Sequence, residues 1–226
     1  RDAVRLIRRS GDHLAGMIEG LLDIARIEAG RIEIYRDQIR FPECLAQLVD
    51  MFRLQSGAKG IDFVFSCPDA LPDTVYTDEK RLRQILINLL SNAIKFTSAG
   101  TVRLVVHWRS PIVEFEVEDT GPGIAPEDQE RIFEPFERAA APGTAGVGLG
   151  LTITRLFTQI MGGEITLIST PGKGSTFRVR LLLSESIQPE QMPVAPVPLG
   201  YVGDRRVIIV CDDDPIHRDL MRDVLA

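Results

Sequence analysis

Cysteine and histidine are scarce in this chain, and neither forms a recognisable motif. The 226 residues include three cysteines, Cys44, Cys67 and Cys211, and three histidines. The cysteines are far apart and lie in different contexts, so the sequence predicts neither a disulfide framework nor a metal site built on cysteine. We therefore expect a protein of a reducing compartment, the cytoplasm.

Positive charge and long apolar runs are also limited. The chain has 26 Lys and Arg against 32 Asp and Glu. This balance argues against nucleic acid as the main partner, because clustered basic residues bind phosphate backbones. No apolar run reaches the roughly 18–20 residues that cross a bilayer, and no signal peptide is recognisable. The chain starts at Arg1 and stops within a helical pattern at Ala226. We therefore expect a piece of a longer protein, whose other segments can include a membrane anchor.

Residues 1–30 carry an apolar stripe typical of an amphipathic helix. Ile7, Leu14 and Leu21 recur every seven positions, with Ile24 on the same stripe. A single helix of this kind cannot bury its apolar face alone. Two partners remain open, namely the globular part of the same chain, or a second helix in a hairpin or dimer.

Strand and helix periods alternate from residue 31 to residue 185, which we predict to be one domain. Strands are predicted at 32–40, 61–66, 101–108, 112–118, 163–169 and 175–183. Helices are predicted at 42–57, 78–96 and 149–161. Hairpins mixed with helices favour an α+β fold, a two-layer α/β sandwich preceded by the long N-terminal helix. Residues 186–203 contain four prolines and predict a linker, and residues 204–226 begin a new unit.

Three groups of residues suggest a nucleotide site. Asn88, Asn92 and Lys95 share one helix face, where amide oxygens can ligate a hard cation and the lysine can pair with phosphate. Asp119 ends a strand, and a carboxylate there can accept a hydrogen bond from the amine of a base. The glycine-rich run at 146–151 opens a helix whose N-terminal amides can bind an anion. A solvent-wetted helix face and a surface turn are the alternatives for the first two groups.

Five blocks in order resemble the N, G1, F, G2 and G3 boxes of sensor histidine kinases. They read RQILINLLSNAIKFT, VEDTGPGI, RIFEPFER, GVGLGLTI and GKGSTF. The resemblance implies the Bergerat ATP-binding fold, ATP and Mg²⁺ as cofactors, and transfer of the γ-phosphate to a histidine. It implies that Asn92 ligates Mg²⁺ with Asn88 beside it, that Lys95 reaches phosphate, and that Phe96 lies along the base bound by Asp119. It also implies further ligand contacts, which are Gly121, Gly123, Ile124, Phe133, Gly146, Val147, Gly148, Leu149, Gly150, Leu151 and Thr176.

Some of these roles have alternatives. Core packing remains open for Phe96, and a hydrogen bond within its strand remains open for Thr176. Small residues at 139–146 have the composition of a mobile lid, with phenylalanines at its base.

The resemblance extends to both flanks of the domain. Residues 1–30 are similar to the second helix of the family's dimerisation and phosphoacceptor hairpin, which implies a homodimer in the full-length protein. The family's phosphorylated histidine lies on the first helix, so we expect His13 to be structural and this chain not to phosphorylate itself. Residues 204–226 resemble the start of a receiver domain, in which Asp212 and Asp213 are similar to a Mg²⁺-binding acidic pair. A hybrid sensor kinase in a phosphorelay is implied, with the hairpin and a receiver domain, its own or a separate response regulator, as partners.

Two rival functions are weighed against the kinase. Gyrase-like ATPases resemble this domain but place Glu at the position of Asn88, where it serves as the base for hydrolysis. An amide cannot take that proton, so Asn88, Asn92 and Lys95 are predicted to serve phosphoryl transfer instead. The other rival is a module that only scaffolds partners and binds no nucleotide.

Overall fold

The computed structural model describes residues 29–137 and 148–185, together with residues 11, 14, 15, 17, 18 and 20–27. All of them belong to the first of two units, Arg1–Ile187 and Gln188–Ala226. The predicted linker, the receiver-like segment and its Asp212 and Asp213 lie outside the described residues. Within the described part, no helix is long and apolar enough to cross a membrane.

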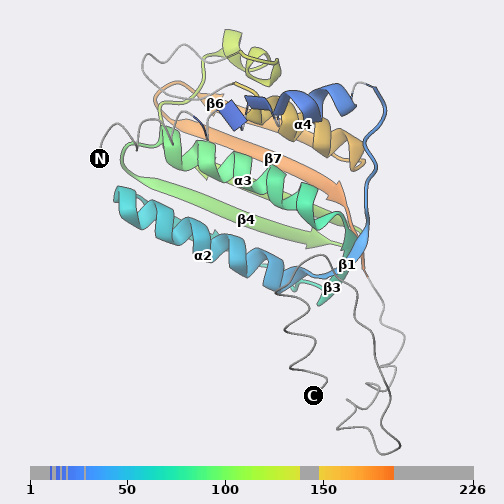
Figure 1. The fold of residues 1–226 in the computed structure, drawn as a ribbon. Coiled ribbons are helices and arrows are strands. Elements are labelled where there is room, and N and C mark those ends of the chain that lie inside the picture. Colours follow the sequence, from blue (N-terminus) through green and yellow to red (C-terminus); the bar gives the residue numbers. More distant parts are fainter. Residues whose placement is uncertain are drawn as a thin grey trace, which may run out of the picture. The chain divides into compact units, whose positions relative to one another are not determined.

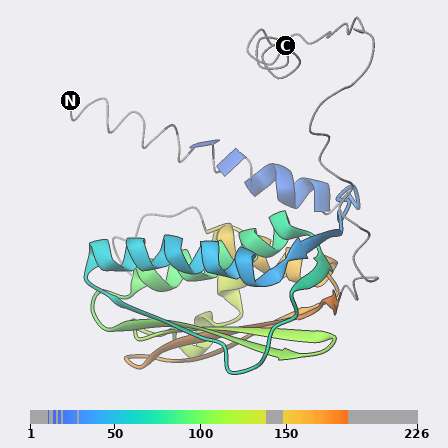
Figure 2. The ribbon, with the colours of Figure 1, turned by 90° about the horizontal axis from the view of Figure 1, so that it is seen from below.

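A five-stranded mixed sheet forms one layer, and three helices, α2 (Phe41–Lys59), α3 (Glu79–Phe96) and α4 (Gly150–Ile160), cover one of its faces (Figures 1 and 2). The strands run in the order β2 (Asp62–Ser66), β4 (Thr101–Arg109), β5 (Ile112–Asp119), β7 (Gly174–Leu182) and β6 (Glu164–Thr170). Only β2 and β4 are parallel. The predicted α+β sandwich is confirmed.

Shorter elements complete the domain. A second sheet joins β1 (Asp37–Arg40), β3 (Thr74–Thr77) and β8 (Ser184–Glu185), and two 3₁₀ turns, η1 (Pro126–Asp128) and η2 (Arg131–Phe133), follow β5. The first predicted strand was too long, because β3 offers only four partners to β1. The sequence analysis also missed β3 and β8, which are too short to show a period.

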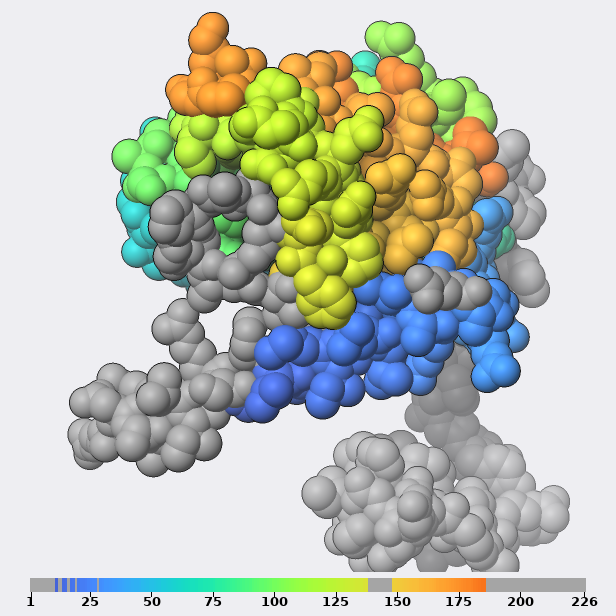
Figure 3. Space-filling view, turned by 90° about the horizontal axis from the view of Figure 1, so that it is seen from above, coloured from blue at the N-terminus to red at the C-terminus, as the bar shows by residue number. Residues whose placement is uncertain are grey.

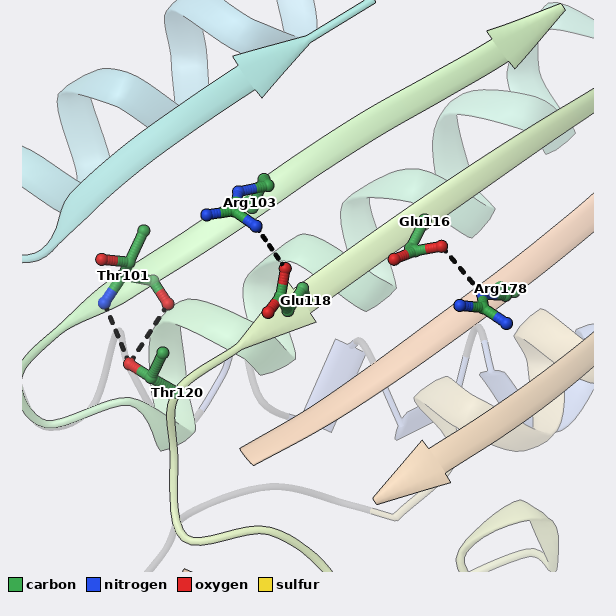
Figure 4. A network of polar contacts seen from close by, with 6 residues as sticks. All are labelled: Thr101, Arg103, Glu116, Glu118, Thr120 and Arg178. Carbon is green, nitrogen blue, oxygen red and sulfur yellow. Dashed lines mark hydrogen bonds and ion pairs between the residues drawn. The ribbon is translucent and has the colours of Figure 1, made fainter. Parts of the chain in front are cut away.

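The two faces of the sheet differ because successive side chains on a strand point to opposite sides. In β5, Val113, Phe115 and Val117 are buried under the helices. The intervening glutamates face outward, where Glu118 pairs with Arg103 and Glu116 with Arg178, both at 2.8 Å (Figure 4). Ion pairs this exposed contribute about 0–1 kcal/mol each, so their main effect is to keep this face polar.

Both ends of α3 are held by side chains. Asp78 caps its N-terminus, where Oδ1 accepts a hydrogen bond from the Arg81 N–H at 3.0 Å and Oδ2 accepts one from the Tyr35 N–H at 3.1 Å. At the other end, Lys59 Nζ donates to the carbonyls of Ile94, Lys95 and Thr97 at 2.5–2.8 Å. These contacts satisfy backbone groups that a helix end leaves unpaired. They fix the helix that carries most of the predicted site.

We expect Lys59→Met to destabilise the domain by about 1–2 kcal/mol, because three carbonyl oxygens lose a charged donor. Urea denaturation followed by circular dichroism measures the loss. Lys80→Met is the matched control, since Lys80 is an exposed lysine at the start of α3. Equal stability of the two variants would show that the Lys59 contacts do not stabilise α3.

The N-terminal helical segment, residues 20–27, packs on the domain by one edge (Figure 3). Ile24 is buried in the domain core, and Asp23 pairs with Arg81 at 3.6 Å. A Cβ on Gly20 would lie 3.1 Å from the Leu149 side chain. Apolar residues of the stripe and beside it remain exposed, and these are Leu14, Ile18, Leu21 and Leu22. Packing on the globular part therefore accounts for one edge of the stripe and leaves the other without a cover among the described residues.

Candidate active site

Asp119 is a buried acid at the end of the central strand β5. Its side chain is 7% exposed, and its Oδ1 accepts a hydrogen bond from the Gly121 N–H at 2.8 Å. Burial raises the pKa of Asp119 above its ordinary value, while backbone hydrogen bonds from Gly121 and Ser175 partly oppose that shift. A carboxylate with so little solvent is well suited to accept a hydrogen bond from a ligand.

Two glycines let the loop after Asp119 fold tightly. A Cβ on Gly121 would lie 2.7 Å from Asp119 Oδ1 and 3.2 Å from the Phe96 carbonyl oxygen. Gly123 has φ 69°, and its Cβ would lie 2.1 Å from the Thr170 carbonyl oxygen. Neither position has room for a side chain. The loop therefore lies against the C-terminal end of α3 on one side and the end of β6 on the other.

Ser169 and Gln129, which the sequence analysis missed, hold this loop in place. The Ile124 N–H donates to Ser169 Oγ at 2.8 Å, and Gln129 Nε2 donates to the carbonyls of Ile124 and Ser169 at 3.1 and 3.0 Å. Neither residue has a local sequence signal, because the contacts join positions five to 45 residues apart.

Thr176 is not brought to the site, which corrects the sequence-based prediction. It pairs with Glu118 in the ladder between β5 and β7, and Ser175 pairs with Asp119. Because side chains alternate along a strand, Thr176 shares the outer face with Glu118 and Arg178. Ser175 is buried beside Asp119, and its Oγ lies 3.0 Å from Ser169 Oγ. Ser175 therefore holds the position that we had predicted for Thr176.

The polar face of α3 carries three of the predicted site residues. Asn88, Asn92 and Lys95 are all half-buried. Asn88 Nδ2 donates to the Gly150 carbonyl at 3.2 Å and to Thr154 Oγ1 at 3.4 Å, so the middle of α3 touches the start of α4. The Lys95 ammonium lies 4.8 Å from the centre of the Phe96 ring. Phe96 is 37% exposed, and it is therefore not the core residue of the alternative interpretation.

The glycine-rich segment is anchored where it enters α4. Gly148 has φ 78°, and its carbonyl accepts a hydrogen bond from the Phe136 N–H at 3.0 Å. Leu149 is buried, so only its backbone can face a ligand, and Leu151 is half-buried. The helix then begins at Gly150, with its N-terminal amides beside Asn88. Gly146, Val147 and the predicted lid at 139–146 lie outside the described residues.

Phe133 packs between two elements of the domain. Its ring lies 6.3 Å from that of Phe177 in an edge arrangement, and the Arg155 guanidinium lies 5.6 Å from its centre. Arg155 belongs to α4 and Phe177 to β7. Phe133 thus holds the segment that precedes the predicted lid against α4 and β7.

Comparison with known proteins identifies the domain. Residues 77–185 match the family described as histidine kinase-, DNA gyrase B- and HSP90-like ATPases. Histidine protein kinase DivJ of Caulobacter vibrioides is 40% identical over 179 residues, which cover 78% of this chain and 30% of DivJ. The chain contains a domain of this family. That domain is the ATP-binding catalytic domain of a two-component sensor histidine kinase.

Further relatives of this kinase domain agree with that identification. Signal transduction histidine-protein kinase BarA of Escherichia coli K12 is 34% identical over 229 residues, which cover 95% of this chain and 25% of BarA. The structure of full-length ShkA in complex with AMPPNP superposes with a TM-score of 0.73 at 36% identity. That match covers 82% of this chain and 39% of ShkA. The chain thus spans under a third of the length of DivJ and BarA.

Proposed function

We propose that this kinase domain binds ATP with its adenine on Asp119 and its phosphates between α3 and α4. The observation that carries this proposal is the position of α3. Its C-terminal end meets the Asp119 loop at the Phe96 carbonyl, and its middle meets the start of α4 through Asn88. One rigid helix therefore spans the distance from the base pocket to the anion-binding helix end.

The side chains fit a magnesium ion that arrives with the nucleotide. Among the described residues, no group of three or more His, Cys, Asp or Glu is arranged to hold a metal. Mg²⁺ commonly keeps several waters and takes its remaining ligands from substrate phosphates and one or two protein oxygens. The Asn92 carboxamide oxygen is such a ligand. When bound, the ion would neutralise charge on the phosphates.

The residues around the phosphates position the nucleotide and stabilise the negative charge of its phosphates. Lys95 contributes a cation, and the first amides of α4 contribute N–H donors with the favourable end of the helix dipole. Asn88 is an amide and cannot act as a general base for attacking water. The arrangement therefore favours transfer of the γ-phosphate to an incoming histidine, whose neutral nitrogen is itself the nucleophile.

The segments before and after this domain suggest its partners. The exposed residues Leu14, Ile18 and Leu21 offer an apolar edge to a partner helix, which suits the phosphoacceptor hairpin of a homodimer. Residues 204–226, with Asp212 and Asp213, would begin a receiver domain of a hybrid kinase in a phosphorelay. The histidine that receives the phosphate would lie on a helix upstream of Arg1.

A calorimetric titration of ATP with and without Mg²⁺ tests the nucleotide site. We expect saturable binding that Mg²⁺ strengthens. Absence of binding in the presence of Mg²⁺ would favour the alternative of a module that only scaffolds partners.

Phosphoryl transfer needs a separate experiment with labelled ATP. We expect this chain alone to acquire no acid-labile phosphate, and a chain extended upstream by the first hairpin helix to acquire it. Phosphorylation of His13 in the shorter chain would contradict the proposal. A His13→Gln variant of the extended chain is the control, and it should be phosphorylated as strongly as the parent.

A further inference from the structure

A buried threonine on α4 contacts Asn88, the asparagine for which the proposed function gives a place beside the nucleotide. Thr154 is 0% exposed and lies one turn after the start of α4. Its Oγ1 donates to the Gly150 carbonyl at 2.9 Å. Asn88 Nδ2 contacts both of these groups, at 3.2 Å from the carbonyl oxygen and 3.4 Å from the hydroxyl oxygen. Asn88, Gly150 and Thr154 thus form a closed set of three hydrogen bonds.

The direction of each hydrogen bond follows from the protons available. A carbonyl oxygen only accepts, so the single Thr154 hydroxyl proton is used on Gly150. The hydroxyl must then present a lone pair to Asn88. The Asn88 side chain therefore faces two acceptors, and only its NH₂ group can satisfy them. The reverse orientation would place the amide oxygen against the Gly150 carbonyl oxygen, which is repulsive.

We propose that Thr154 is a positioning residue that turns the Asn88 carboxamide, so that its oxygen remains for the ligand. The two acceptor oxygens lie only 2.9 Å apart, so one amide hydrogen is shared between them, and the carboxamide oxygen of Asn88 is turned away from both. This inference rests on the proposed function. There, the oxygen faces a hydrated magnesium ion carried by ATP, whose water molecules are hydrogen-bond donors. Without the Thr154 hydroxyl the NH₂ group keeps one acceptor, the Gly150 carbonyl, so the amide is held less firmly in the orientation that turns its oxygen to the ligand.

Thr158 supplies a matched control on the same helix. It is also 0% exposed, and its Oγ1 donates to the Thr154 carbonyl at 2.7 Å, four residues back. Thr154→Val and Thr158→Val therefore make the same substitution and remove the same kind of hydroxyl–carbonyl bond. Only Thr154→Val removes a contact with Asn88.

The first test compares ATP affinity in Mg²⁺ and in EDTA for the parent and both valine variants. We expect the gain in ATP affinity on adding Mg²⁺ to be roughly tenfold smaller in Thr154→Val than in the parent, in line with the loss of groups that orient metal ligands. Its affinity in EDTA should be nearly unchanged. Thr158→Val should keep the full magnesium effect, and Thr154→Ser, which retains the hydroxyl, should restore it. An equal magnesium effect in the two valine variants overturns the inference.

The second test needs neither nucleotide nor a variant of Thr154. Side-chain amide resonances of the parent are recorded by NMR, and Asn88→Asp identifies those of Asn88 by their loss. We expect two well-separated Asn88 amide protons, of which the one shared by Gly150 and Thr154 exchanges slowly with water. Rapid exchange overturns the inference even if Thr154→Val fails to fold. If the parent shows no magnesium effect on ATP affinity, the proposed function fails together with this inference. A parent with that effect but with a freely exchanging Asn88 amide leaves the proposed function standing.

Discussion

Asp119→Asn is expected to reduce ATP affinity by about a hundredfold or more while the domain stays folded. The substitution replaces an acceptor with a group that also donates, at the point where we propose that the adenine amine donates. A buried donor that faces another donor costs roughly 1–3 kcal/mol beyond the lost hydrogen bond, and about 1.4 kcal/mol corresponds to tenfold in affinity. Calorimetry with Mg·ATP measures the loss.

Glu118→Gln is the matched control for this variant. Glu118 is the preceding residue of β5, but it faces outward and pairs with Arg103. Its substitution makes the same change from carboxylate to amide on the opposite face of the sheet, and we expect ATP affinity within twofold of the parent. Unchanged ATP affinity in Asp119→Asn would contradict the proposal that adenine binds to Asp119.

The same variant should alter how stability depends on pH. Burial raises the pKa of Asp119 in the folded domain, so the ionised carboxylate costs folding free energy. That cost is absent below the unfolded-state pKa of about 4 and grows as pH rises through the raised value. Asp119→Asn removes the titrating group. Between pH 4 and pH 7.5, the melting temperature of the nucleotide-free variant should therefore fall less, or rise more, than that of the parent.

Gly148→Ala is expected to be the more damaging of two alanine substitutions in the glycine-rich segment. Gly148 has a left-handed φ of 78°, and its Cβ would lie 2.9 Å from the Phe136 carbonyl carbon. The conformation alone costs a non-glycine residue about 1–2 kcal/mol, and the close contact adds to it. We expect the melting temperature to fall by roughly 4–8 °C. ATP affinity should fall as well, because the entry to α4 shifts.

Gly150→Ala is the comparison for Gly148→Ala. Gly150 is helical, and its Cβ would lie 3.8 Å from Asn88 Cγ, an ordinary contact. Alanine favours a helix over glycine by up to about 1 kcal/mol, so thermal stability should hold or rise slightly. Equal melting temperatures for the two variants, measured by differential scanning calorimetry, would contradict the geometry at Gly148.

The parts of the site that could be predicted were those with a local signal. The apolar period of α3 is visible within a few residues, as is a cap at Thr77 or Asp78, of which the structure selects Asp78. The glycines at 121 and 148 are needed by the backbone of their own turns. Thr176 was misplaced because a shift of one residue moves a side chain to the other face of a strand. The long strand predicted at 32–40 failed because its outer half has no partner strand.

The amino-acid order by itself determined the layers of the fold and the family, and it supplied most of the residues that we propose to meet ATP. Periodicity and turn chemistry depend on neighbours along the chain, so they can be read without coordinates. Only the tertiary structure decided that Ser175 lies beside Asp119, that Lys59 caps α3 and that Thr154 orients Asn88. These contacts join positions 35 to 66 residues apart. Such contacts form because packing brings separate elements together, and no local pattern encodes which side chains then meet.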